Sequence, residues 1–223
     1  DMSDAETASS LMALGEAWGV TLSEDAVADA ASALPVPVDT GGGRIEELAH
    51  PLFLGIPAGD MNQDDLITAD LSRTVNFGAP GAFTAGDLAE GSELTPLLTT
   101  GPSPSFIDAT EAVTDMTPQQ VLRQYQTEPA PLALAARLSG HLKTAFPQGA
   151  PAFDEPSDPM LAEIARAEAA SALPHISESE TEAQIVLIAD VDFIADEFYI
   201  IPNEQIVVAD NGALVLNALD ALA

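Results

Sequence analysis

Two aspartates at the end of an apolar run are the residues whose type and spacing best suit chemistry. Asp190 and Asp192 follow the run Gln-Ile-Val-Leu-Ile-Ala at 184–189, which has the length of a strand. Open α/β sheets bind ligands outside the carboxyl ends of their strands. With Asp196 and Glu197, the pair could supply the hard oxygen ligands that Mg²⁺ or Ca²⁺ prefers. Asp190 and Asp192 are therefore the candidate ligand-binding residues.

The same aspartates also suit a structural role. An aspartate after a strand accepts hydrogen bonds from free backbone amides, and it complements the positive end of a following helix dipole. The spacing is not that of a calcium loop, which needs a glycine at its sixth position and a glutamate at its twelfth. We favour a strand-end turn with a helix cap, and ligand binding stays open.

Other residues offer little for catalysis. His50, His141 and His175 are too far apart in sequence for a local zinc motif. There is no cysteine and no G-x-S-x-G motif, and 36 acidic residues make chance carboxylate pairs inevitable. We assign no catalytic residue, no metal site and no cofactor.

The charge balance excludes whole classes of partner. The 223 residues include 36 acidic and 6 basic side chains, a formal net charge of −30. No two basic residues are adjacent, so the chain lacks the cationic patch that nucleic acid or an anionic membrane surface requires. The sequence shows no signal peptide and no apolar run of the roughly 20 residues that span a bilayer. Because it begins at Asp1, we expect a piece of a longer protein whose targeting or anchoring segments are absent.

The elements around the aspartates follow α/β patterning. The run 184–189 predicts a central parallel strand covered on both faces, and Leu132 to Leu138 predicts another buried strand. Asn211-Gly212 opens a final helix, in which four leucines are expected to form the buried side: Leu214, Leu216, Leu219 and Leu222. No linker divides the chain, which we interpret as a single α/β domain over 1–223.

Local signals place the remaining elements. Leu34 to Val38 alternates with prolines and predicts an edge strand that turns at 39–43 into a hairpin with 44–48. Residues 50–110 read as short strands joined by loops. Helices are predicted in three places: from a Ser3/Glu6 capping box to a stop at Gly19, from a Thr117 cap to about Gln126, and over 160–173.

Several weak motifs occur in a characteristic order. They are Trp18-Gly19-Val20, His50-Pro51-Leu52-Phe53-Leu54, Asn62-Gln63-Asp64-Asp65, Pro80-Gly81-Ala82-Phe83, Thr95-Pro96-Leu97-Leu98, Gly140 to Phe146, Ile188 to Asp196 and Asn211 to Leu222. This succession resembles the extracytoplasmic domain of the gliding-motility-type ABC transporter auxiliary component (GldG-like) family over nearly the whole chain.

The resemblance implies a fold, a place and partners. The fold would be a three-layer α/β sandwich with a mostly parallel central sheet, similar to class I glutamine-amidotransferase-like folds, with extra short strands. The domain would lie on the periplasmic or extracytoplasmic face of the cytoplasmic membrane, anchored only through segments absent from this chain. It would work beside an ABC permease and ATPase, and the family offers no catalytic residues to transfer.

Three functions remain in view. The leading hypothesis is a non-enzymatic auxiliary domain of an ABC-type transport system that binds a partner protein or a transported substance, with a preference for cationic ligands. The second is a metal-dependent hydrolase that uses Asp190, Asp192 and a histidine to activate water. The third is a structural spacer or scaffold.

Overall fold

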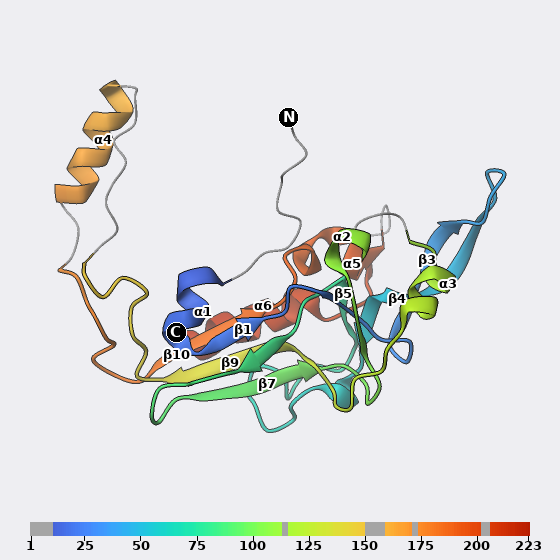
Figure 1. Ribbon diagram of the computed structural model, residues 1–223, viewed down its shortest axis with the longest axis horizontal. Coiled ribbons are helices and arrows are strands. Elements are labelled where there is room, and N and C mark those ends of the chain that lie inside the picture. The colour runs from blue at the N-terminus through green and yellow to red at the C-terminus, as the bar shows by residue number, and fades with distance from the viewer. Residues whose placement is uncertain (1–10, 113–115, 150–158, 171–173, 202–205) are drawn as a thin grey trace.

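The computed structural model describes residues 11–112, 116–149, 159–170, 174–201 and 206–223 (Figure 1). Its strands are β1 (Val20–Leu22), β2 (Ala26–Ala28), β3 (Ala33–Asp39), β4 (Ile45–Ile56), β5 (Val75–Gly78), β6 (Phe83–Ala85), β7 (Glu93–Thr99), β8 (Ser105–Ile107), β9 (Ala133–Gly140), β10 (Ala183–Ile188), β11 (Ile200–Ile201) and β12 (Ile206–Val207). Its α-helices are α1 (Met12–Trp18), α2 (Ala109–Ala112), α3 (Pro118–Gln124), α4 (Pro159–Ala170), α5 (Asp196–Tyr199) and α6 (Asn211–Leu222), and its 3₁₀ turns are η1 (Ala58–Asp60) and η2 (Asp192–Ile194).

The main sheet is antiparallel and centred on β9. Strands β1, β6, β9 and β10 follow one another in this sheet, and β7 also pairs with β9. Every strand pair among the described residues is antiparallel, including the smaller β2–β8 and β11–β12 pairs. The expected three-layer sandwich with a mostly parallel sheet, similar to a class I glutamine-amidotransferase-like fold, is therefore wrong. The chain has a mixed α/β fold with antiparallel sheets.

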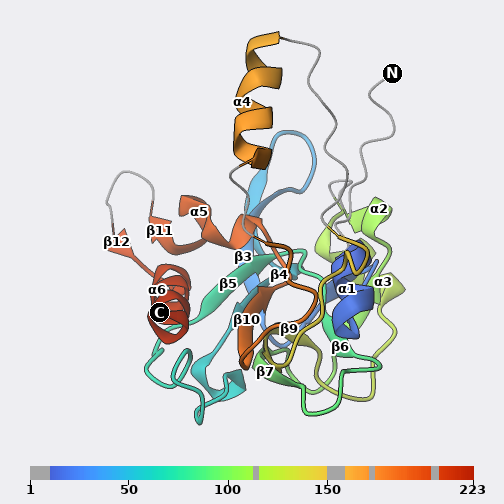
Figure 2. The same ribbon diagram turned by 90° about the vertical axis from the view of Figure 1, so that its left-hand side faces the viewer.

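The position of β10 explains the error. Val186 and Ile188 pack against a core cluster that includes Leu214 of α6, whereas Ile185 and Leu187 belong to a second cluster on the opposite face, with α1 and β1. In the end-on view of Figure 2, α6 lies on one side of β9 and β10, and α1 lies on the other. An unbroken apolar run in the sequence indicates that both faces of the strand are covered, but it does not indicate whether the neighbouring strands are parallel or antiparallel. The run at 184–189 is an antiparallel edge strand, while the predicted buried strand at 132–138 is the central one.

The hairpin prediction is confirmed. Strand β3 pairs antiparallel with β4, and β4 pairs in turn with β5. Pro35 and Pro37 lie on β3, at the edge of this three-stranded sheet, where a missing N–H removes no necessary ladder bond. The turn at its tip contains three consecutive glycines with positive φ, at 41–43, and it projects from one end of the molecule (Figure 1).

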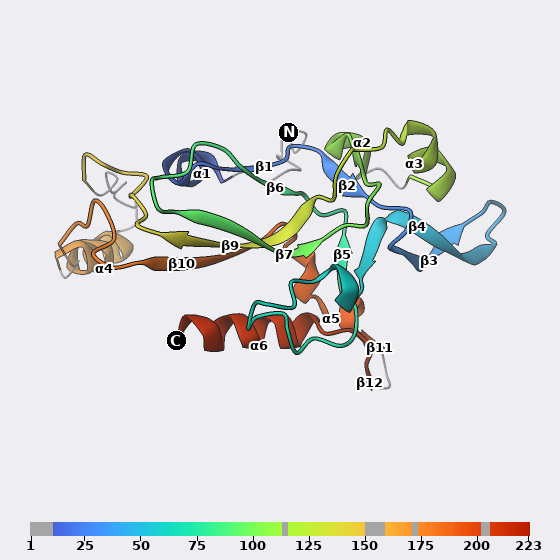
Figure 3. The same ribbon diagram turned by 90° about the horizontal axis from the view of Figure 1, so that it is seen from below.

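The predicted cap of α3 and the predicted stop of α1 are confirmed, but α1 begins at Met12 with Leu11 as its N-cap, later than the predicted start. Thr117 and Gln120 form a reciprocal capping box with Pro118 in the first turn of α3. Helix α1 ends at Gly19, whose φ of 69° is left-handed. The Ser3/Glu6 capping box and residues 171–173 of the third predicted helix lie outside the described residues. Helix α4 stands away from the body of the molecule (Figures 1 and 2), at the end opposite the β3–β4 hairpin (Figure 3).

The buried side of α6 differs from the prediction. Leu214 is fully buried, but Leu216 and Leu219 are 64% and 60% exposed, and Leu222 is also exposed. The side that packs on the body contains Asn211, Leu214 and Ala218, which follow helical spacing. Because α6 is apolar almost all round, its sequence could not show which side is buried.

Candidate functional site

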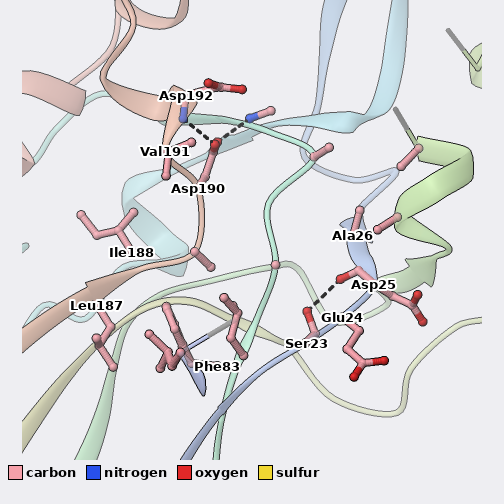
Figure 4. Close-up of a pocket in the computed structure, with 18 of the residues that line it drawn as sticks. Ser23, Glu24, Asp25, Ala26, Phe83, Leu187, Ile188, Asp190, Val191 and Asp192 are labelled. Carbon is pink, nitrogen blue, oxygen red and sulfur yellow. Dashed lines mark hydrogen bonds between the residues drawn. The ribbon is translucent and has the colours of Figure 1, made fainter. Parts of the chain in front are cut away.

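A groove of about 780 Å³ lies beside β10 and contains both predicted site residues (Figure 4). One wall is the end of β10 and the turn after it, and the other runs from β1 into β2. The segment between β5 and β6 forms the floor, and α2 closes one end. The lining residues are Leu11, 22–26, Gly78, Ala79, Gly81, Phe83, Ala109, Ala112 and 186–192.

Backbone hydrogen bonds tie the floor to both walls. The amides of Ser23 and Val27 donate to the carbonyls of Ala82 and Pro80, at 2.9 and 2.6 Å. On the other side, the amide of Gly81 donates to the carbonyl of Ala189 at 2.8 Å. The groove is therefore a built feature of the fold, because its walls cannot separate without breaking these bonds.

The floor also holds a residue in an unfavourable conformation. Ala79 has a φ of 45°, in the left-handed region where a Cβ is disfavoured. Its amide donates to the carbonyl of Leu52 at 2.6 Å. The surrounding hydrogen bonds hold Ala79 in place, and they keep the chain reversal between β5 and β6 beneath the groove.

Asp190 fastens the β10 wall to the floor. One carboxylate oxygen accepts the amide of Gly78 at 2.7 Å, and the other accepts the amide of Asp192 at 2.8 Å. Burial raises the pKa of Asp190, and the hydrogen bonds from Gly78 and Asp192 oppose that rise. The strand-end turn interpretation of Asp190 matches this geometry.

Asp192 has a different environment. Its side chain is exposed at the start of η2, and it lies on the rim of the groove. Glu24 and Asp25 are exposed on the opposite wall. None of these three carboxylates has a hydrogen bond or ion pair within the described residues. Among the residues that the structure describes, no lysine, arginine or histidine lines the groove, so an apolar floor is flanked by uncompensated negative charge.

The structure does not assemble the ligand set of a metal-dependent hydrolase in the part of the chain that it describes. Within those ranges, no three His, Asp or Glu side chains are grouped so that they could hold a metal ion. His50 is buried between the carbonyl of Met116 and the amide of Leu52, and His141 faces the carbonyl of Ser179. His175 is exposed and does not line the groove.

Sequence reasoning missed the second wall of the groove. Glu24 and Asp25 are two acids among 36, and nothing in their spacing distinguishes them. A usable signal was the Gly-Ala-Pro-Gly segment at 78–81, because such a segment lets the backbone turn sharply. Only the fold brings this turn between two acidic loops.

Comparison with known proteins gives the family. The sequence model of a family described as an ABC-type uncharacterized transport system, auxiliary component, matches residues 2–218. The chain belongs to this family. Searches of curated proteins and of solved structures found no match. The ABC transport auxiliary family thus accounts for nearly the whole chain, including both walls of the groove.

Membership also bears on the expected partners. An auxiliary component of an ABC-type transport system acts with other subunits of that system, which agrees with the expectation of transporter partners. In the described residues of this ABC transport auxiliary protein, none of the helices has the length and apolar character needed to cross a bilayer.

Proposed function

We propose that this chain is a non-enzymatic, extracytoplasmic domain of an ABC-type transport system, and that it works by binding through the groove. The observation that carries the proposal is the acidic rim around an apolar floor, because that combination suits recognition of a cationic or basic partner. Family membership supports the transport role.

The state of the carboxylates supports binding over catalysis. Both oxygens of Asp190 accept backbone amides, so this residue is occupied in holding the fold. Asp192, Glu24 and Asp25 are exposed to solvent. Catalytic acids usually lie in an enclosed environment that shifts their pKa, and these three side chains do not. These three side chains are suited to attract a ligand.

The finer assignment comes from the sequence resemblance. The order of motifs resembles GldG-like proteins, and on that basis we place the domain on the periplasmic side, with the permease and ATPase of the same system as its partners. The net charge of −30 favours a partner with a basic surface, because complementary fields speed encounter and suppress wrong partners.

A capture experiment tests the binding role. The protein in its full-length, membrane-bound form is tagged and captured from detergent-solubilised membranes, and the permease and ATPase are sought by mass spectrometry. A groove variant combines Glu24→Gln, Asp25→Asn and Asp192→Asn. A control variant removes the same charge from three exposed acids that do not line the groove, Glu47, Asp70 and Asp220.

We expect wild type and the control variant to capture the transporter subunits, and the groove variant to capture much less. Equal capture by both variants would refute binding through the groove and favour a spacer. The hydrolase alternative has its own test, because a bound cation stabilises the folded state. We expect Mg²⁺, Mn²⁺, Ca²⁺ and Zn²⁺ to leave the melting temperature unchanged, and a rise that Asp190→Asn abolishes would contradict the non-enzymatic assignment.

A further inference from the structure

The outer side of β10 is an unpaired strand edge along the groove. In the antiparallel pair with β9, the amide of Ala189 donates to the carbonyl of Leu134 at 2.9 Å. Backbone groups alternate in direction along an antiparallel strand. Those of Ile185 and Leu187 therefore point toward β9, whereas those of Gln184, Val186 and Ile188 point away from it. No strand pairs with this outer side in the described part of the chain.

The sequence of β10 has none of the residues that usually protect an edge strand against pairing. Two other edge strands carry prolines: β3 contains Pro35 and Pro37, and β7 contains Pro96 with two irregularities in its register. Strand β10 is Ala-Gln-Ile-Val-Leu-Ile, with no proline, no charge and a regular register over all its pairs. Proteins normally blunt an edge of this kind, since it is a template for another strand.

The edge and the acidic rim belong to one surface. Residues 186–192 line the groove continuously, so the end of the open edge leads directly to Asp192, with Glu24 and Asp25 across the floor. Figure 4 shows the three acids around the space between the two walls. A strand laid against β10 would thus have its backbone paired with the edge and its end among carboxylates.

We propose that the groove binds an extended, basic segment of a partner protein, which adds to the main sheet as a strand beside β10. The inference rests on the proposed binding role and specifies its ligand. Backbone pairing along the edge supplies the affinity common to strand addition, and lysine or arginine side chains that reach Asp192, Glu24 and Asp25 supply the selectivity.

Charge selects this occupant over a second copy or the chain's own start. Two copies joined through β10 would bring two acidic grooves together, each on a chain of net charge −30. Residues 1–10 contain three acids and no basic residue, so they complement the rim no better. Like charges placed opposite each other oppose association, whereas a basic segment neutralises the rim.

Fluorescence anisotropy with synthetic peptides tests the inference. The probe is a labelled peptide of about eight residues that alternates threonine and valine between terminal lysines, a length that matches a typical strand. One control peptide replaces its lysines with glutamates. A second keeps the lysines but carries N-methyl groups on its inner amides, which removes the donors needed to pair with β10 while leaving the charge unchanged.

We expect the basic peptide to bind wild type saturably, and to bind the Glu24/Asp25/Asp192 variant at least about tenfold more weakly. The acidic and the N-methylated peptides should each lose about tenfold or more. Gln184→Pro should weaken binding similarly, because its amide faces away from β9 and its loss removes no ladder bond within the sheet. Circular dichroism checks that this variant is folded, and the N-methylated peptide tests the same pairing without changing the protein.

Several results would overturn the inference. Equal binding of the N-methylated and unmodified peptides would mean that charge alone acts, without strand pairing. A wild-type dimer in light scattering that Gln184→Pro abolishes would assign the edge to a second copy. If the protein captures the permease and ATPase but binds no peptide, strand addition is refuted and the binding role stands. If it neither captures them nor binds peptide, the binding role is refuted as well.

Discussion

Replacing Asp190 with alanine should weaken the whole fold, because this side chain joins β10 to the groove floor. The variant removes two hydrogen bonds to a carboxylate, at 2.7 and 2.8 Å, from the amides of Gly78 and Asp192. Bonds to charged groups contribute about 1.5–3 kcal/mol each. Relief of the desolvated charge offsets part of this loss, since burial is the largest influence on the pKa of Asp190. We expect a net loss of about 2 kcal/mol in the free energy of unfolding.

The assay is urea unfolding, followed by circular dichroism and by the fluorescence of Trp18, the only tryptophan in the chain. For a chain of this size, a loss of about 2 kcal/mol also lowers the melting temperature by about 4–8 °C. Asp192→Ala is the matched control, because it removes an exposed carboxylate two residues away that has no partner in the described residues. It should change the free energy of unfolding by less than about 0.5 kcal/mol. Equal effects of the two substitutions would refute the clamp assigned to Asp190.

Four further outcomes follow from the same reasoning, each measured by urea unfolding. Ala79→Gly should raise the free energy of unfolding by up to about 1 kcal/mol by releasing the left-handed alanine, and Ala79→Val should lower it by at least that amount; the opposite order would contradict the strain. Arg137→Met should cost about 3 kcal/mol or more, since it strands the buried carboxylate of Asp65, now held at 2.8 Å; a change below about 1 kcal/mol would show that the pair is solvated. Asn211→Leu should lower the free energy of unfolding by about 3 kcal/mol, because it breaks two buried hydrogen bonds with the backbone of Asn76 in β5 and one with the carbonyl of Phe193 in η2. An unchanged free energy of unfolding would contradict that network. Burial raises the pKa of Asp190 above 3.8 in the folded state, so its protonation stabilises the fold fully below pH 3.8, and this contribution is lost as the pH rises through the folded pKa. The difference in the free energy of unfolding between wild type and Asp190→Asn should therefore change with pH over that window. A difference that stays constant would refute the raised pKa.

Local chemistry was readable from the sequence because it depends on neighbours along the chain. Thr117 with Gln120, the glycine stop at Gly19 and the proline-bearing strand β3 all formed as expected. Each signal reports a backbone preference or a local hydrogen bond, which distant residues do not alter. Membership of an ABC transport auxiliary family was also readable, since motif order survives where single motifs are weak, and the finer GldG-like assignment stays a prediction.

Strand direction and partner strands were not readable. The apolar run of β10 records that α6 covers one face and α1 the other, and a parallel or an antiparallel neighbour would leave the same record. The prediction of the buried side of α6 was wrong for a related reason. Leu214 and Leu216 are equally apolar, but only Leu214 packs against the body of the molecule. The groove lies between segments about 170 residues apart in the sequence. Its acidic residues could not be told apart from the other acids of the chain by sequence alone.

The glycine tip of the β3–β4 hairpin has a practical use. A Cβ added at Gly41, Gly42 or Gly43 would meet nothing within 4 Å, and the tip projects from one end of the molecule, away from β10 (Figure 1). Loop tips of this kind accept inserted sequence with little loss of stability. A fluorophore-labelling tag placed between Gly41 and Gly42 would report the protein's position in living cells without touching its binding surface.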